Sequence, residues 1–230
     1  MTARADSDLG PPSPRSRVRR EPHRGVYDRA TVDAVLDAAL VCHLAFEDGG
    51  QPFAVPTLHA RVGDVVYVHG SAASRALRTL RAGAPACLTV TVVDGLVLAR
   101  SVFEHSVNYR SVMVLGRARE VTGTAAKTAA LEAFTERLAP GRWAEARRPT
   151  SQELAATAIF ELPLTEASAK IRNGPPEDGD TADGELAIWA GVVPLHTSWG
   201  RPEPDPALRP GIGVPDSVRR LLAGEPPGPA

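Results

Sequence analysis

The chain has 230 residues, a length typical of one domain or one and a half, and a chain of this size buries about 70% of its unfolded surface. Lys and Arg total 26 against 27 Asp and Glu, for a formal net charge of -1, so no global field attracts a polyanion and nucleic-acid binding is not expected. Hydrophobic residues make up 43% and charged residues 23%, the ordinary globular range, and no apolar run approaches the roughly 20 residues that cross a bilayer. We therefore expect a cytoplasmic globular protein without a membrane partner.

Residues 1–26 are predicted to be a disordered, basic and Pro-rich N-terminal arm. Pro11, Pro12 and Pro14 break any helix, and the arginines that follow have no apolar partners. An arm that wraps around a partner subunit is the alternative. This stretch also lacks the apolar segment of a secretory signal.

The first periodic element covers residues 31–40. Val32, Val35, Leu36 and Leu40 make one helical stripe there, and Asp28 or Thr31 is available as the N-cap. The sequence therefore predicts an amphipathic helix.

The period then changes to that of strands. Residues 41–46, 53–61 and 65–69 alternate as strands joined by Gly-containing turns, which predicts an antiparallel meander. A short helix begins at Ser71 or Ala72 and ends near Gly83. Two further strands at 86–98 and 111–121 are rich in β-branched residues. Closing these strands into a small barrel removes the sheet edges.

The next segment returns to a helical period. Residues 124–138 are predicted to be a helix that buries Ala129, Leu131, Phe134 and Leu138, and Thr150 begins a further helix with the capping-box spacing. Final strands are expected at 158–162 and 167–171.

The C-terminal part of the chain is rich in Pro, Gly and Asp after Gly174. It is interrupted by the apolar stretch 188–194 and ends in a helical turn at 214–222. We thus expect one domain over residues 27–195 and an extension over residues 196–230.

Cysteine and histidine usage excludes two kinds of site. Cys42 and Cys87 lie in apolar segments and are expected to be buried, unreactive thiols, so no disulfide framework is present. The histidines are scattered without metal-ligand spacing, so no metal site is expected.

One strand-to-helix corner combines backbone freedom with polar groups. His69 ends a strand, Gly70 permits a turn, and Ser71, Ser74 and Arg75 stand at the start of a helix. A helix start beside a guanidinium suits a phosphate monoester, although an ordinary helix cap has the same residues.

Polar residues also gather at 100–111, between two apolar strands, where a binding loop or a solvated loop are both compatible with the sequence. Lys170 and Arg172 alternate on one face of a strand, which indicates an anionic ligand or a charge-protected edge.

The order of these segments resembles the pyridoxamine-phosphate-oxidase-like flavoproteins, and within them the nitroimidazole-resistance branch. The combination of HGS at 69–71, NYRS at 108–111 and WAG at 189–191 carries the resemblance, which extends from about Arg19 to Pro194. It implies a mainly β fold, a six-stranded antiparallel split β-barrel with a few flanking helices, which forms a homodimer that holds FMN at the subunit interface. The Arg- and His-containing C-terminal signature of true pyridoxamine phosphate oxidases is not evident, so oxidation of vitamin B6 is not expected.

The resemblance also implies a set of cofactor-binding residues. The backbone of Ala54, Val55, Pro56 and Thr57 would lie against the flavin ring, and His69, Gly70 and Ser71 would lie beside the ring or the ribityl chain. The phosphate would be bound by Ser74 and Arg75. The partner subunit would supply the remaining residues: Asn108, Tyr109, Arg110, Ser111 and Trp189.

A flavin supplies the hydride and electron chemistry itself, so few catalytic side chains are needed. We expect His69 to act as a proton donor near the ring, and Tyr109 or His105 to act on the substrate side. The predicted function is an FMN-dependent oxidoreductase that reduces a small nitro- or quinone-like molecule with NAD(P)H as the donor. The alternative is a non-catalytic flavin binder or a haem binder in which His59, His69 or His105 is the axial ligand.

Overall fold

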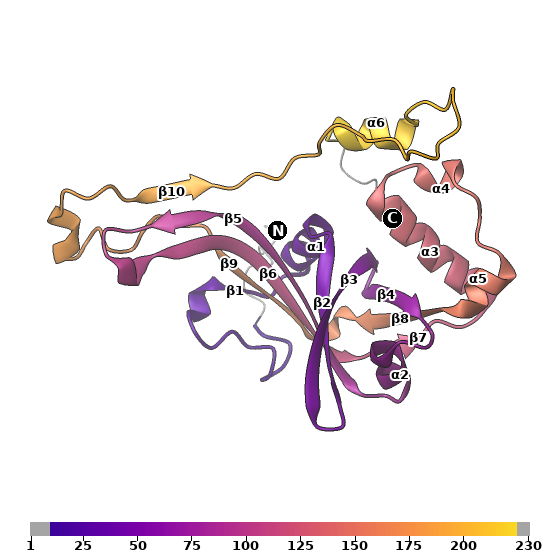
Figure 1. Ribbon diagram of the computed structural model, residues 1–230. Coiled ribbons are helices and arrows are strands. Elements are labelled where there is room, and N and C mark those ends of the chain that lie inside the picture. Colours follow the sequence, from indigo (N-terminus) through magenta and orange to yellow (C-terminus); the bar gives the residue numbers. More distant parts are fainter. Residues whose placement is uncertain (1–9, 225–230) are drawn as a thin grey trace, which may run out of the picture.

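The computed structural model describes residues 10–224, and within them ten strands form one antiparallel sheet (Figure 1). The strand order is β1-β9-β6-β5-β2-β3-β4-β8-β7, and β10 pairs with β5. The strands are β1 (Gly25–Val26), β2 (Val41–Asp48), β3 (Gln51–Val62), β4 (Val65–Ser71), β5 (Pro85–Leu98), β6 (Ser106–Arg117), β7 (Arg119–Glu120), β8 (Thr157–Pro163), β9 (Ala167–Arg172) and β10 (Gly191–Pro194). The α-helices are α1 (Arg29–Ala38), α2 (Arg75–Arg81), α3 (Thr124–Leu138), α4 (Arg142–Glu145), α5 (Ser151–Ala156) and α6 (Asp216–Leu222). Short 3-10 turns are η2 (Pro22–Arg24), η3 (Val102–Glu104), η4 (Leu164–Glu166) and η5 (Ala182–Glu185).

This architecture confirms the predicted antiparallel split β-barrel with flanking helices. The predicted strand at 111–121 differs most from the structure, because β6 begins earlier, at Ser106, and ends at Arg117. The polar residues of its first half satisfy their backbone groups by pairing with β5 on one side and β9 on the other. A polar sequence therefore continues a strand where a loop was expected.

The β2–β3 hairpin is closed by two consecutive glycines. Gly49 and Gly50 have φ angles of 62° and 82°, the left-handed pair that a two-residue hairpin turn requires. The turn fixes the register in which Phe46 lies opposite Phe53. Their rings stack with centroids 5.6 Å apart.

Helix α1 is capped as expected and packs on the sheet. The Asp28 carboxylate accepts a hydrogen bond of 2.8 Å from the Thr31 amide, and Val32, Val35 and Leu36 are buried in the main core. Leu40, predicted to continue the stripe, is 44% exposed, because the backbone turns extended at Ala39 and leaves the helix.

Helix α3 covers the other part of the sheet through a narrow face. It buries Ala130 and Phe134 in a second cluster with Ile159. The predicted buried face was wrong at two positions: Ala129 is exposed and Leu138 is 43% exposed. Residues 130, 134 and 137 share one side of the helix at its 3.6-residue period, and only that side meets the sheet.

Other local predictions are confirmed. Thr150 and Glu153 form the reciprocal capping box at the start of α5, with bonds of 3.2 and 2.7 Å. Cys42 is buried as expected, and burial raises the pKa of its thiol to about 12. Cys87 was also expected to be buried but is half-buried, and this burial raises the pKa of its thiol as well. Neither thiol ionises near neutral pH.

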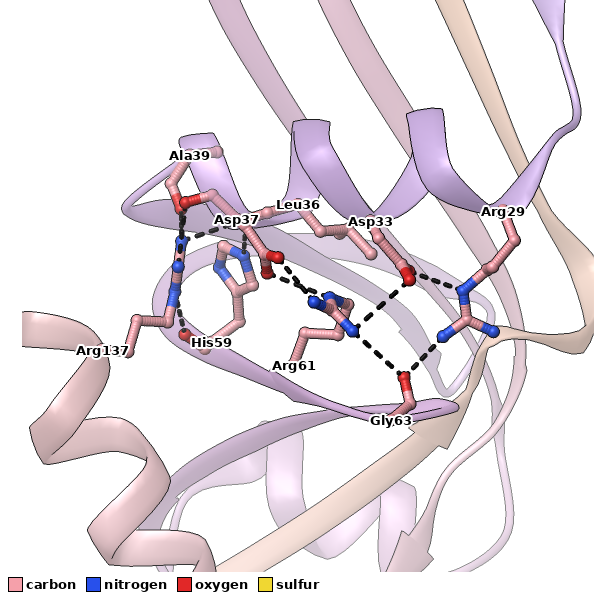
Figure 2. A network of polar contacts seen from close by, with 9 residues as sticks. All are labelled: Arg29, Asp33, Leu36, Asp37, Ala39, His59, Arg61, Gly63 and Arg137. Atoms are coloured by element: carbon pink, nitrogen blue, oxygen red, sulfur yellow. Dashed lines mark hydrogen bonds and ion pairs between the residues drawn. The ribbon is translucent and has the colours of Figure 1, made fainter. Parts of the chain in front are cut away.

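Arg137 joins α3, α1 and β3 (Figure 2). Its guanidinium donates to the carbonyl of His59 on β3 at 3.1 Å and to those of Leu36, Asp37 and Ala39 at the end of α1, the first two at 3.0 and 2.9 Å. A helix C-terminus leaves carbonyls without partners, and here a cation from another helix satisfies them.

His59 lies beside this network and is 1% exposed. Its Nε2 bonds to the Leu36 carbonyl at 2.9 Å; a carbonyl can only accept, so Nε2 carries the proton. Burial lowers the pKa of His59 to about 4. The ring is therefore a neutral structural donor.

The described part of the N-terminal segment contacts the barrel. Arg15 forms an ion pair with Glu166, Ser16 is buried, and the Val18 amide donates to the Tyr27 hydroxyl at 2.9 Å. Residues 10–24 thus differ from the disorder expected for residues 1–26, while residues 1–9 lie outside the described residues.

The far ends of β5 and β6 extend beyond the barrel together with β10 (Figure 1), and we call residues 94–110 and 186–195 the arm. At its tip, in the turn between β5 and β6, the buried Asp178 accepts hydrogen bonds from the amides of Arg100 and Ser101. Gly95 lets β10 approach closely, since a Cβ there would lie 2.8 Å from the Val193 carbonyl oxygen. Large apolar side chains on the arm face solvent: Leu96, Val102, Phe103, Ile188, Trp189 and Leu195.

The search for membrane spans found no helix among residues 10–224 with the length and apolar character to cross a bilayer.

The buried His59 predicts a pH-dependent stability. The folded state keeps the imidazole neutral down to about pH 4, whereas the unfolded chain binds a proton below about pH 6.5. The contribution of His59 to the free energy of unfolding is therefore fully present above neutral pH and is lost as the pH falls from about 6.5 to about 4. From pH 7 to pH 5 the loss at this site is about 2 kcal/mol.

His59→Gln keeps a donor for the Leu36 carbonyl but does not titrate. Between pH 7 and pH 5 its free energy of unfolding, measured with denaturant, is expected to fall by about 2 kcal/mol less than that of the wild type. His23→Gln, at an exposed histidine, is the control and should behave as wild type. An equal loss in His59→Gln and wild type would contradict the assignment.

Candidate functional site

The corner between β4 and α2 is built by local hydrogen bonds. The Ser74 amide donates to the Ser71 carbonyl at 2.9 Å, and the Ser74 hydroxyl accepts from the Leu77 amide at 3.3 Å as the N-cap of α2. The Ser71 hydroxyl accepts from the Ala73 amide in the same way. Each serine therefore uses an acceptor site in the fold and keeps its hydroxyl proton available to an anion.

Arg75, the first residue of α2, is held by an aromatic ring. Its guanidinium carbon lies 4.5 Å from the centroid of Phe53 on the β2–β3 hairpin. The nearest carboxylate, on Asp48, is 3.9 Å away, and both side chains are at least half exposed. This weak pairing leaves the guanidinium able to bind an anionic group.

A cleft of about 480 Å³ opens beside this corner. One part is apolar, with Leu44, Phe46, Phe53 and Val55 from the hairpin. The other part is polar, and it contains Thr57, His69, Ser74 and Arg75. Such a cleft fits a flat, largely apolar ring that carries a negatively charged chain.

His69 forms part of the wall of this cleft. It sits on β4 opposite Ile159, and its ring is tilted against the Phe134 ring with centroids 4.3 Å apart. Its Nδ1 is buried without a hydrogen-bond partner in the protein, and burial lowers the pKa of the ring. His69 is therefore a neutral imidazole near pH 7.

The structure brings one group of the predicted site residues together. Val55, Pro56, Thr57, His69, Gly70, Ser74 and Arg75 all line the cleft. Ala54 and Ser71 are adjacent in the chain but exposed and outside its lining. Strand alternation explains Ala54, whose side chain points to the opposite face from Phe53 and Val55.

The second predicted group lies on the arm or at its base and not in this cleft. Asn108 is buried and accepts from Arg172 at 2.7 Å, Arg110 pairs with Asp94 at 2.7 Å, and the Ser111 hydroxyl donates to the Lys170 carbonyl at 3.2 Å. Tyr109 lies opposite Val93 and Arg172 in the sheet, His105 accepts from the Ala99 amide at 3.1 Å, and Trp189 is 66% exposed. Among the described residues of one chain, the predicted site residues on the arm do not line the cleft that Val55 to Arg75 form.

Arg172 has a different role from either one expected for it. It is 5% exposed and donates to the Gly174 and Pro175 carbonyls, which folds the chain back after β9. Because it is buried, it does not protect an exposed edge.

Apart from Val55, sequence reasoning missed the apolar half of the cleft, namely Leu44, Phe46 and Phe53. Leu44 and Phe46 alternate on β2, and Phe53 and Val55 alternate on β3, a pattern also expected of ordinary core residues. The cross-strand pair Phe46 and Phe53 could have been found from the two-glycine turn, which sets their register.

A metal centre has no support in the part of the chain that the structure describes, where no three His, Cys, Asp or Glu side chains gather.

Residues 28–171 match the family model described as pyridoxamine 5'-phosphate oxidase. The chain belongs to this family. None of the curated proteins compared matches the chain.

Two solved structures are similar over nearly their whole length. The flavocytochrome Anf3 from Azotobacter vinelandii is 41% identical, with a TM-score of 0.88 over 93% of this chain and 99% of that chain. The FAD and heme binding protein from Mycobacterium smegmatis is 40% identical, with a TM-score of 0.82 over 86% of this chain and 97% of that chain.

A structure from Bacteroides thetaiotaomicron assigned to 5-nitroimidazole antibiotic resistance is 17% identical, with a TM-score of 0.55 over 64% of this chain and 86% of that chain. At that identity it shares the fold alone. The family expected from the sequence is confirmed, while the nitroimidazole-resistance branch stays a prediction.

Proposed function

We propose that the protein is a flavin-dependent oxidoreductase. One observation carries the proposal: a single cleft joins an apolar slot, lined by Phe46, Phe53 and Val55, to an incompletely neutralised guanidinium at Arg75. The slot fits the isoalloxazine ring, and Arg75 with the hydroxyl of Ser74 fits the first phosphate. When bound, the flavin supplies the hydride and electron transfer.

FMN was expected from the sequence, and two observations favour FAD instead. A second cleft of about 380 Å³ adjoins the first at Arg75 and contains Arg78 and Thr79, which offer donors for a second phosphate, beside the carboxylates of Glu47 and Asp48. The Mycobacterium smegmatis relative is described as binding FAD. Both cofactors share the ring and the first phosphate, so the proposed role of Arg75 is the same for either.

The neutral His69 is proposed to hydrogen-bond to the flavin ring or the substrate and to provide a proton near the ring. Burial disfavours the protonated ring, so His69 would enter the reaction neutral and take up a proton before it delivers one; its Nδ1 has no hydrogen-bond partner in the protein. The substrate is proposed to be a small nitro- or quinone-like molecule, with NAD(P)H as the donor. Tyr109 and His105 would act from a second subunit.

Arg75→Ala is expected to weaken flavin binding by about ten- to a hundredfold, because it removes a charge-assisted contact to the phosphate. Purified protein is expected to be yellow, and the dissociation constant is measured by fluorescence titration, with mass spectrometry to distinguish FAD from FMN. Arg119→Ala, at an exposed arginine paired with Glu161, is the matched control. A colourless protein that takes up neither flavin would refute the proposal.

A homodimer is proposed to complete the site. The arm exposes Phe103 (87%) and Trp189 (66%), and its polar residues lie apart from the cleft of their own chain. A second copy is the proposed occupant, because its arm would bring Asn108 to Ser111 to the open side of the flavin ring.

The double variant Phe103→Ser with Trp189→Ser is therefore expected to be monomeric and to bind flavin more weakly, as measured by light scattering and titration. Leu138→Ser, at a half-exposed leucine on α3, is the control and should leave the dimer intact. A wild-type protein that is monomeric at all concentrations would contradict the proposal.

Haem is the second candidate ligand, since the Azotobacter vinelandii relative is described as a flavocytochrome and the Mycobacterium smegmatis relative as binding heme. Of the three histidines expected as axial ligands, His59 donates its Nε2 proton to a carbonyl, and its Nδ1 is buried. His105 accepts an amide proton on Nδ1, so its neutral ring carries the proton on Nε2. His69 keeps an Nε2 without a hydrogen bond in the protein.

If haem binds, His69→Ala should therefore lose the Soret band of the ligated haem, whereas His59→Gln and His105→Ala should keep it. The visible spectrum after haem titration is the measurement. An unchanged band in His69→Ala would exclude His69 as the ligand.

A further inference from the structure

The described N-terminal segment encloses a second polar cleft, separate from the flavin cleft. Residues 16–20 form one wall, and the outer face of β5, β6 and β9 forms the other. The volume is about 460 Å³. The segment is fixed before, within and after this stretch: Arg15 pairs with Glu166, the Val18 amide donates to the Tyr27 hydroxyl, and Arg24 pairs with Glu177. The cleft is therefore part of the folded structure.

The sheet face of this cleft carries hydroxyl groups in register. Thr91, Ser111 and Lys170 lie side by side across the three strands, and Thr89, Met113 and Ser168 form the next row. All six line the cleft. The hydroxyls of Thr89, Thr91 and Ser168 and the Lys170 ammonium group suit phosphate oxygens, which need several donors. The Ser111 hydroxyl already donates to the Lys170 carbonyl.

Four cations line the same cleft: Arg17, Arg19, Arg20 and Lys170. Among the residues that the structure describes, none of the four lies within 4.0 Å of a carboxylate, and no Asp or Glu lines the cleft. The neighbouring arginines of the segment differ, since Arg15 pairs with Glu166 and Arg24 with Glu177. Four like charges in one concavity raise its positive potential, and an anion with two charged groups would relieve their repulsion.

An apolar cleft of about 690 Å³ adjoins the basic one and shares Arg17, Val18 and Arg19 with it. Its remaining wall is formed mainly by Pro11, Pro12, Pro14 and Pro22. Proline rings offer a flat apolar surface against which a heteroaromatic base can lie. The two clefts together thus provide a place for a diphosphate and, next to it, for a base.

We propose that the N-terminal segment and the outer face of β5, β6 and β9 bind a small molecule with a nucleoside diphosphate group. The diphosphate lies among Arg17, Arg19, Arg20 and Lys170, and the base lies against the prolines. The lining of this site shares no residue with that of the flavin cleft in the same chain. Ser111 also belongs to the segment proposed to reach the partner's flavin, but the nucleotide site does not depend on that role.

ADP is the probe, with pyrophosphate and adenosine as its two halves, titrated calorimetrically into the full-length protein already saturated with whatever flavin it binds. ADP is expected to bind, pyrophosphate more weakly and adenosine very weakly. The triple variant Arg17→Ala, Arg19→Ala, Arg20→Ala should weaken ADP binding by about tenfold or more, and Lys170→Met by several-fold, because each removes a charged donor. Arg201→Ala with Arg209→Ala, at exposed arginines elsewhere, is the matched control.

Three outcomes would overturn the proposal. ADP that fails to bind at millimolar concentration, or that binds the triple variant as tightly as the control, leaves no nucleotide site. ADP that displaces flavin enters the flavin cleft instead. If the protein binds no ADP and the triple variant changes the oligomeric state, the basic cleft is a contact surface for a second copy. An unchanged flavin spectrum in the triple variant separates this test from that of the proposed function.

Discussion

The contact on which the arrangement of the site depends is the clasp formed by Arg137. One guanidinium satisfies carbonyls at the end of α1 and on β3, so three elements distant in sequence are fixed to each other at a single group. A largely desolvated cation needs several acceptors to offset its loss of hydration, and here backbone carbonyls provide them for the partly buried Arg137. An apolar residue could fill the space but could not orient the helix.

The clasp reaches the flavin cleft through α3. Phe134 lies one turn before Arg137 on the same face, and its ring packs on His69. The position of α3 therefore determines how deeply the His69 ring is buried, and burial is what depresses its pKa. On the other side of the cleft, Phe53 is both a wall of the apolar slot and the platform under Arg75. Ring recognition and anion recognition thus share one hairpin.

Much of the fold could be predicted from the sequence, because the local rules agreed with the tertiary structure. The cap at Asp28, the meander of β2 to β4 and the capping box at Thr150 all follow from short-range hydrogen bonding and periodicity. The predictions failed where burial or strand pairing depends on elements that are distant in sequence. Leu40 and Leu138 fit a helical stripe but lie beyond the end of the packed face, and residues 106–110 read as a loop until β5 and β9 pair with them.

The same division holds for the candidate site. His69, Ser74 and Arg75 were accessible to sequence reasoning because they are neighbours along the chain at a strand-to-helix corner. Phe134, more than sixty positions away, reaches His69 only through the packing of α3. The residues of the arm could be named from a resemblance to a family, but their distance from the cleft of their own chain could not be read from any local pattern.

Asp178 and β10, which brace the tip and flank of the arm, both lie beyond residue 171, where the match to the family ends. The shared barrel therefore supplies the two long strands, and a separate downstream segment supplies their stiffening. During synthesis the paired ends of β5 and β6 emerge from the ribosome well before their support does. In evolution, that downstream segment can lengthen, shorten or change sequence and so reshape the arm, while every residue of the barrel stays as it is.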